Sequence, residues 1–290
     1  MAPNKADCDK LTKPYRFKNT PDGTIGIRFK PPDVTPATMV SYSEEKILEV
    51  LRNANYLHHD PKYSNEDKLH VEDKWDCDDR AFVGVAAVRF WLPGCPVGIA
   101  VGHSGNVQHA VVVYWFQDNN KKWIHKYFEP WDKKEAVGFN DDKSIIAFPL
   151  FRQDFSQEST DSLGMGLLKK FTRVENKSFC YDKGQDFSRF DEIESFLKAR
   201  NFGKLPEDTT FKDLRKDYYD PEDLLLWVRQ EVRRRFIDSP IGVAFGIKNK
   251  SPYATLVLWK SADDPRIWDV NRQINGEIKE SEFTARAIII

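Results

Sequence analysis

The order of polar and apolar positions predicts two helices followed by four strands in the first half of the chain. Ser41-x-x-Glu44 is a helix-capping pattern and predicts a helix through about Asn55. Asp76 begins a second predicted helix, through about Trp91, whose residues are apolar almost all round, as in a buried helix. The β-branched and aromatic runs that follow, separated by short turns, predict antiparallel strands over 97–101, 110–115, 123–128 and 144–148.

The predicted elements recur in the second half of the chain. Residues 96–115 align without a gap on residues 240–259, at a constant spacing of 144 residues. Identical pairs include Pro96 and Pro240, Gly98 and Gly242, Ala100 and Ala244, Gly102 and Gly246, and Trp115 and Trp259. Upstream, 76–79 corresponds to 220–223, and 51–56 corresponds to 197–202. The sequence therefore predicts two diverged copies of one unit.

The expected fold class is α+β, with two units that each pack a buried helix on an antiparallel β-sheet. The proline-rich residues 1–40 are expected to form an extended N-terminal arm. The first unit should span 41–153 and the second 186–290. The polar stretch over 154–185 is the expected linker between them.

Three residues of the first unit form a candidate catalytic set. Cys77 falls at the start of the second predicted helix, where the helix dipole and free N–H groups favour a thiolate. His109 begins a strand that should lie against this helix, and it is the candidate general base. Glu129 ends the next strand and would orient the imidazole. Cys95 is the rival nucleophile, but it lies past the helix end, where no dipole favours the anion.

The second unit lacks this set. Pro221 occupies the position that corresponds to the nucleophile, and Tyr253 the position that corresponds to the base. All 6 histidines of the chain precede residue 126. Any chemistry of this kind is therefore expected in the first unit alone.

Three carboxylates surround the candidate nucleophile: Asp76, Asp78 and Asp79. Without compensation they would raise the pKa of the thiol. A hard divalent cation would offset them, which makes these acids candidate calcium ligands. The alternative is that acids in a first helical turn only complement the helix dipole, as Glu222 and Asp223 would in the second unit.

Composition and charge narrow the class of protein. The net charge of −1 gives no overall field that would attract nucleic acid. No apolar run is long enough for a membrane span, and the first residues lack the apolar core of a signal peptide, so a cytoplasmic protein with free thiols is expected. A further feature is a basic helical patch, expected to face solvent, made by Arg229, Arg233, Arg234 and Arg235.

The motif residues resemble those of a known family. They are Trp75-Asp76-Cys77-Asp78-Asp79-x-Ala81-Phe82, Gly98-x-Ala100, His109-Ala110 and Phe128-Glu129-Pro130. This pattern, over about residues 40–150, resembles the papain-like cysteine peptidase domain of the Marasmius oreades agglutinin family. Arg80 departs from it, because an apolar or aromatic residue is expected there.

The resemblance implies a calcium-dependent peptidase with Cys77, His109 and Glu129 as catalytic residues and Asp76, Asp78 and Asp79 near the metal. The expected function is therefore hydrolysis of amide bonds in a peptide or protein substrate. One alternative is a transglutaminase-like acyltransferase, which would use a similar Cys–His pair. Another is a non-enzymatic binding or scaffold protein in which both units are inert.

Overall fold

A computed structural model describes both predicted units. The described residues are 40–71, 74–121, 123–148, 178–179, 186–200, 202, 221–239, 241–248, 251–261, 264–270, 275–278 and 282–289. The predicted arm and most of the predicted linker lie outside these residues. The described part combines helices with antiparallel sheet, which confirms the α+β class.

The first unit places two helices before a five-stranded sheet. Its elements are α2 (Glu44–Asn53), the 3-10 turn η3 (Pro61–Tyr63), α3 (Cys77–Trp91), β1 (Val97–Ser104), β2 (Val107–Gln117), β3 (Trp123–Glu129), β4 (Lys134–Glu135) and β5 (Phe139–Phe148). The strands lie in the order β4-β3-β2-β1-β5, and all described pairings are antiparallel.

The second unit repeats this order. Its elements are β6 (Ser178–Phe179), η4 (Phe187–Arg189), α5 (Phe190–Ala199), α7 (Pro221–Arg235), β7 (Ile241–Lys248), β8 (Ser251–Ser261), β9 (Asp264–Val270), β10 (Asn275–Ile278) and β11 (Phe283–Ile289). The strands lie in the order β10-β9-β8-β7-β11-β6. Apart from β6, the strand order of the second sheet is that of the first.

Helix α3 is buried because every side of it meets protein. Its residues pack against β1 and β2 on one side and against α2 and α7 elsewhere. Gly84 permits the closest approach, since a Cβ at this position would lie 2.7 Å from a methyl group of Val112 on β2. The predicted all-round apolar helix is thus enclosed between its own sheet and the second unit.

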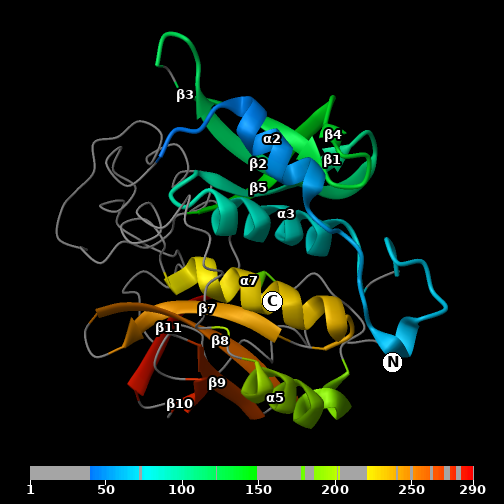
Figure 1. Ribbon diagram of the computed structural model, residues 1–290, viewed down its shortest axis with the longest axis vertical. Helices are drawn as coiled ribbons and strands as arrows, with labels where there is room; N and C mark the ends of the chain where they lie inside the picture. Colours follow the sequence, from blue (N-terminus) through cyan, green and yellow to red (C-terminus); the bar gives the residue numbers. More distant parts are fainter. Residues whose placement is uncertain are drawn as a thin grey trace.

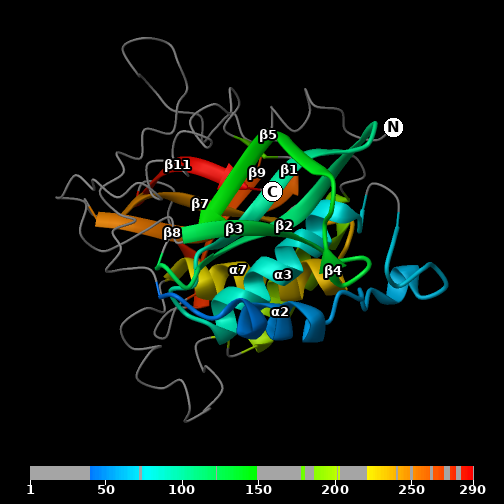
Figure 2. The same ribbon diagram turned by 90° about the horizontal axis from the view of Figure 1, so that it is seen from above.

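The two units meet through their long helices. Figure 1 shows α3 and α7 side by side at the centre of the molecule, with the two sheets on the outer sides. The view from above in Figure 2 shows α2 beside α3, on the flank of this layer. One hydrophobic core continues across the contact, in which the rings of Phe90 and Trp227 lie 5.2 Å apart.

Two local predictions were wrong. The cap of α2 is Ser43 and not Ser41, because the Ser43 side chain accepts the hydrogen bond from the Lys46 N–H. The second sheet is not wholly antiparallel, because Ser178–Phe179, inside the predicted linker, pairs with β11 in parallel. This strand is only two residues long, so no periodicity marks it in the sequence.

Candidate active site

The first turn of α3 carries the candidate nucleophile. Asp76 is the N-cap, and its side chain accepts a hydrogen bond from the Asp78 N–H at 3.3 Å. Cys77 is therefore the first helical residue, as the sequence predicted. The preceding Trp75 is fully buried, and its indole N–H donates to the Tyr56 carbonyl at 3.1 Å. This anchor sets the direction from which the chain enters the helix.

Strands β2 and β3 bring the candidate base and acid together. Val112 pairs with Phe128, which brings His109 and Glu129 to neighbouring ends of the two strands. The Nε2 atom of His109 lies 2.5 Å from Oε2 of Glu129. The other carboxylate oxygen of Glu129 accepts the Trp131 N–H at 3.0 Å. Both oxygens of the acid are thus engaged, and the imidazole is held in one orientation.

The charge of Glu129 is favoured in this setting. Burial alone would raise the pKa of its carboxyl group, but the hydrogen bonds from His109 and from the Trp131 N–H lower it below its ordinary value. An ionised Glu129 accepts a hydrogen bond from a protonated Nε2 of His109. The second ring nitrogen, Nδ1, then remains for proton exchange with a nucleophile.

Helix α3, which begins at Cys77, packs on β2, the strand that carries His109. The backbone N–H of Ala110, the residue after His109, favours the anion of the Cys77 thiol. Burial, followed by the charges of Asp78 and Asp76, raises the pKa of Cys77, while the Ala110 N–H and Arg80 oppose the shift. The acids beside the thiol thus act on its pKa in the direction opposite to that expected from the helix start.

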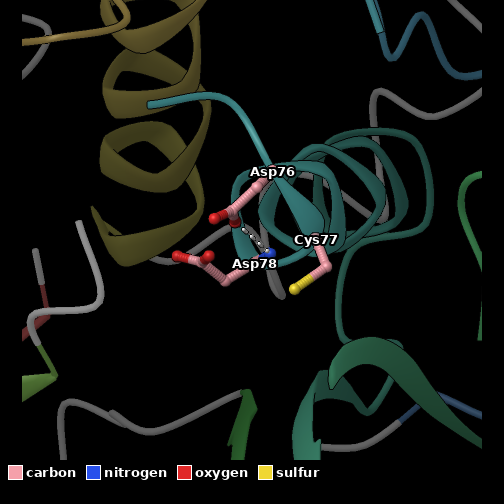
Figure 3. A group of neighbouring side chains, drawn as sticks. All are labelled: Asp76, Cys77 and Asp78. Atoms are coloured by element: carbon pink, nitrogen blue, oxygen red, sulfur yellow. Dashed lines mark hydrogen bonds between the residues drawn. The ribbon is translucent and has the colours of Figure 1, made fainter. Parts of the chain in front are cut away.

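The three predicted metal-binding acids do not stay together. Suitable ligand atoms of Asp76, Cys77 and Asp78 lie within 4.8 Å of one another. In Figure 3 the carboxylates of Asp76 and Asp78 lie next to each other, and the thiol points to another side of the helix start. Asp79 is fully buried, and its two oxygens accept from Arg233 at 3.1 and 2.7 Å.

The separation of Asp79 from Asp76 and Asp78 limits the number of oxygen ligands that the site offers to calcium. Calcium takes about six to eight oxygen ligands. Asp76 and Asp78 supply carboxylate oxygens of the right kind, whereas Asp79 serves an ion pair between the units. Burial would raise the pKa of Asp76, but hydrogen bonds from Asp78 and the charge of Arg233 lower it. Two of the three predicted ligands therefore fit a cation, and Asp79 does not.

Arg80 is a site residue to which sequence reasoning gave no role. Its side chain is 3% exposed, and its guanidinium carbon lies 4.1 Å from the centre of the Trp131 ring. Nη1 donates to the Leu69 carbonyl at 2.9 Å. Burial lowers the pKa of Arg80, and the charges of Cys77 and Glu129 oppose this shift. The signal in the sequence was its spacing, one helical turn after the nucleophile.

The rival nucleophile is enclosed in the core. Cys95 is fully buried, and its carbonyl accepts from Arg89 at 3.1 Å. Burial raises the pKa of its thiol to about 12. Cys95 is thus out of contact with solvent, whereas Cys77 is partly exposed. Cys8 and Cys180 lie outside the described residues.

The basic patch predicted on α7 does not face solvent as a whole. Arg229 and Arg233 are each 1% exposed, and both are directed at Asp79 of the first unit. The guanidinium carbon of Arg229 also lies 4.0 Å from the centre of the Phe82 ring. The two arginines are four residues apart on one helix face, and this face is an interface between the units.

The second unit has different groups at the corresponding register positions. Tyr253 pairs with Gly246, just as His109 pairs with Gly102 in the first unit. Asp269 follows the β9 residue Trp268 as Glu129 follows Phe128, but it is paired with Lys248 at 2.9 Å.

Comparison with known proteins adds little to this geometry. No protein-family model matches the chain, and no curated protein matches it. A solved structure of Polyporus squamosus lectin, bound to a human-type influenza-binding epitope, resembles the chain at 14% identity and a TM-score of 0.25. The match covers 65% of this chain and 70% of the lectin chain. A likeness at this TM-score carries no inference about fold or function.

None of the described helices combines the length and the apolar character that a membrane crossing requires.

Proposed function

We propose that the first unit is a papain-like cysteine hydrolase of amide bonds that acts on a peptide or protein substrate. The observation that carries this proposal is the 2.5 Å contact between His109 Nε2 and Glu129, in a unit where α3, which begins at Cys77, packs on the strand of His109. A nucleophile, a base and an orienting acid in this arrangement are the parts that acyl transfer requires.

The proposed reaction begins with proton transfer. His109 Nδ1 takes the proton from the Cys77 thiol, and Glu129 stabilises the imidazolium through Nε2. The thiolate sulfur attacks the substrate carbonyl carbon, and the negative charge moves to the carbonyl oxygen. The backbone N–H of Cys77, at a helix start where N–H groups have no intrahelical partner, is a donor for this oxyanion.

The intermediate then collapses to products. The C–N bond breaks, and His109 returns its proton to the leaving amine. The acyl group is now a thioester on Cys77. A water molecule, deprotonated by His109, attacks the thioester and releases a carboxylic acid and the free thiol.

We infer that the two units descend from one duplicated unit. Supporting this inference, α3 and α7 each span 15 residues, and their sheets share the same strand order apart from β6. Under this inference the second unit is a degenerate copy, with Pro221 and Tyr253 at the positions of the nucleophile and the base.

Cleavage of peptides is the direct test of the proposed reaction. The full chain is incubated with a mixture of peptides, and new termini are identified by mass spectrometry, with Cys77→Ala and Cys95→Ala run in parallel. The proposal expects cleavage by wild type and by Cys95→Ala and none by Cys77→Ala. Addition of a primary amine separates the acyltransferase alternative, which would give amide-linked amine in place of a new carboxyl terminus. Absence of both products would favour an inert scaffold.

Calcium is a separate part of the proposal. Asp76 and Asp78 would hold the ion, whose charge would offset the two acids beside the thiol. No step of the reaction above passes through it. Calorimetry tests this part: binding at millimolar calcium is expected for wild type and is expected to be lost in a variant with Asp76→Asn and Asp78→Asn. A wild-type chain that gives no binding heat at these concentrations would contradict it.

A further inference from the structure

One side chain of the second unit reaches into the first unit beside the candidate nucleophile. Arg233 of α7 has 2% of its side chain exposed. Its Nε and Nη2 donate to the two oxygens of Asp79, and Nη2 also donates to the Lys74 carbonyl at 2.9 Å. Nη1 donates to the Ser239 carbonyl of its own unit at 3.1 Å. The guanidinium is therefore fixed in orientation by bonds on all three nitrogens.

The two first-unit partners of Arg233 stand on either side of Cys77. Lys74 belongs to the turn that leads into α3, and Asp79 belongs to the first turn of the helix itself. A planar guanidinium that bonds both at once fixes the angle between the entering chain and the helix. Lysine, with one ammonium nitrogen, does not reproduce this forked geometry. The position of the nucleophile is thus tied to a residue of the other unit.

A second set of contacts holds the same turn independently. The Tyr63 hydroxyl donates to Asp238 of the second unit at 2.8 Å, and the Lys74 ammonium donates to the Tyr63 oxygen at 3.1 Å. Nearby, the Arg234 Nε donates to the Leu57 carbonyl at 3.0 Å. The segment between α2 and α3 therefore rests on the C-terminal end of α7 at several points.

We propose that Arg233 is a positioning residue for Cys77, and that the second unit serves the first by holding the start of α3 in its reactive geometry. This inference rests on the proposed function of Cys77, His109 and Glu129. Under this inference the second unit supports the reaction of the first, although it has no Cys–His–Glu set of its own. Misplacement of a reacting group by about 1 Å is enough to reduce a rate roughly 10²-fold.

Three variants separate positioning from general stability. Arg233→Lys keeps the charge and loses the fork. The combined variant Asp79→Asn, Arg229→Met and Arg233→Met removes all three buried charges of this contact, so that none is left unpaired, but also removes the bond to Lys74. Arg235→Met is the matched control, because Arg235 lies on the same helix and packs on Phe196 and Phe236 of its own unit. The measurements are kcat, KM, the unfolding midpoint and amide hydrogen exchange.

The expected result is a local defect without a global one. In the combined variant the unfolding midpoint stays near that of wild type, kcat falls roughly 10²-fold with KM little changed, and amides of 74–80 lose protection relative to those of β2. Arg233→Lys shows the same defect to a smaller degree, and Arg235→Met shows none. A combined variant that retains wild-type kcat, or protection at 74–80, would overturn the inference. The exchange measurement needs no turnover, so an inactive wild-type chain would count against the proposed function, and exchange alone would then decide this inference.

Discussion

The two units of the chain have the same frame and different residues at three register positions. In the first, a helix begins at Cys77, and His109 and Glu129 meet at the ends of β2 and β3. In the second, the equivalent helix begins at Pro221, and Tyr253 and Asp269 take the corresponding strand positions. The equivalent acid is engaged by Lys248 and not by a histidine.

This comparison separates what forms the fold from what would perform chemistry. Paired glycines, a paired proline and a paired tryptophan recur at corresponding positions, and the two sheets share one strand order apart from β6. Proline at a first helical position suits a helix start and offers no nucleophile. The second unit contacts the first through the buried pair of Asp79 and Arg233, and the role that we propose for it would act across this α3–α7 contact.

The largest expected effect comes from removing the candidate nucleophile of the first unit, a thiol that the second unit lacks at the corresponding position. Cys77→Ala should reduce turnover by at least about 10³-fold, because the other described thiol, that of Cys95, is fully buried. Peptide cleavage measures the loss, and circular dichroism should show an unchanged fold. Cys95→Ala is the control with retained turnover. Full turnover by Cys77→Ala would show that Cys77 is not the nucleophile.

Removal of the second unit is expected to have the next largest effect. A fragment of residues 1–185 would expose Phe82 and the other α3 residues that α7 covers, which should lower the free energy of unfolding by at least about 2 kcal/mol. Binding of a hydrophobic dye and thermal unfolding measure this. A monomeric fragment that is fully active and as heat-resistant as the whole chain would show that the second unit has a separate role.

The acids at equivalent register positions should differ in importance. Glu129→Gln should reduce turnover roughly 10²-fold, less than loss of the nucleophile, because an orienting group is partly replaceable. Asp269→Asn, the matched change in the second unit, should leave turnover unchanged. Steady-state kinetics of both variants give the answer. Equal losses from the two substitutions would mean that the units are not functionally distinct.

The smallest expected effect concerns pH at the contact between the units. Burial, followed by the charge of Arg234 on α7, lowers the pKa of His59 below its ordinary value of 6.5. As pH falls below about 6.5, the unfolded chain therefore binds more protons than the folded chain. The neutral form of His59 supports the folded state fully above this pH, and the free energy of unfolding decreases below it. His59→Gln should reduce the drop in unfolding midpoint between pH 7.5 and 5.5. An identical drop in the variant would assign the pH dependence to other groups.

Local signals in the sequence predicted most of the frame. The Asp76 cap, the apolar α3 and the β-branched strands were all located, because each depends on neighbouring residues. The choice of Ser43 over Ser41 was missed because both serines suit a cap, and only the position of the Lys46 N–H decides between them.

Ion pairs between residues far apart in the chain could not be predicted from the sequence. Asp79 and Arg233 are 154 residues apart, so no local pattern distinguishes their pair from a metal ligand and a solvated arginine. Arg80 likewise gains its meaning from Trp131, which reaches it only when β3 has paired with β2. His109 and Glu129 were located because strand ends meet predictably when neighbouring strands pair.

We propose Cys77, activated by His109, as the nucleophile of this chain. A peptide carrying a vinyl sulfone, which forms a thioether only when a thiol attacks and a proton is supplied, tests it directly when the modified residue is identified by mass spectrometry at pH 7. We expect selective modification of Cys77 among the four cysteines, and loss of this modification in His109→Ala. Equally slow reaction of all four thiols, or undiminished modification of Cys77 in His109→Ala, would contradict it.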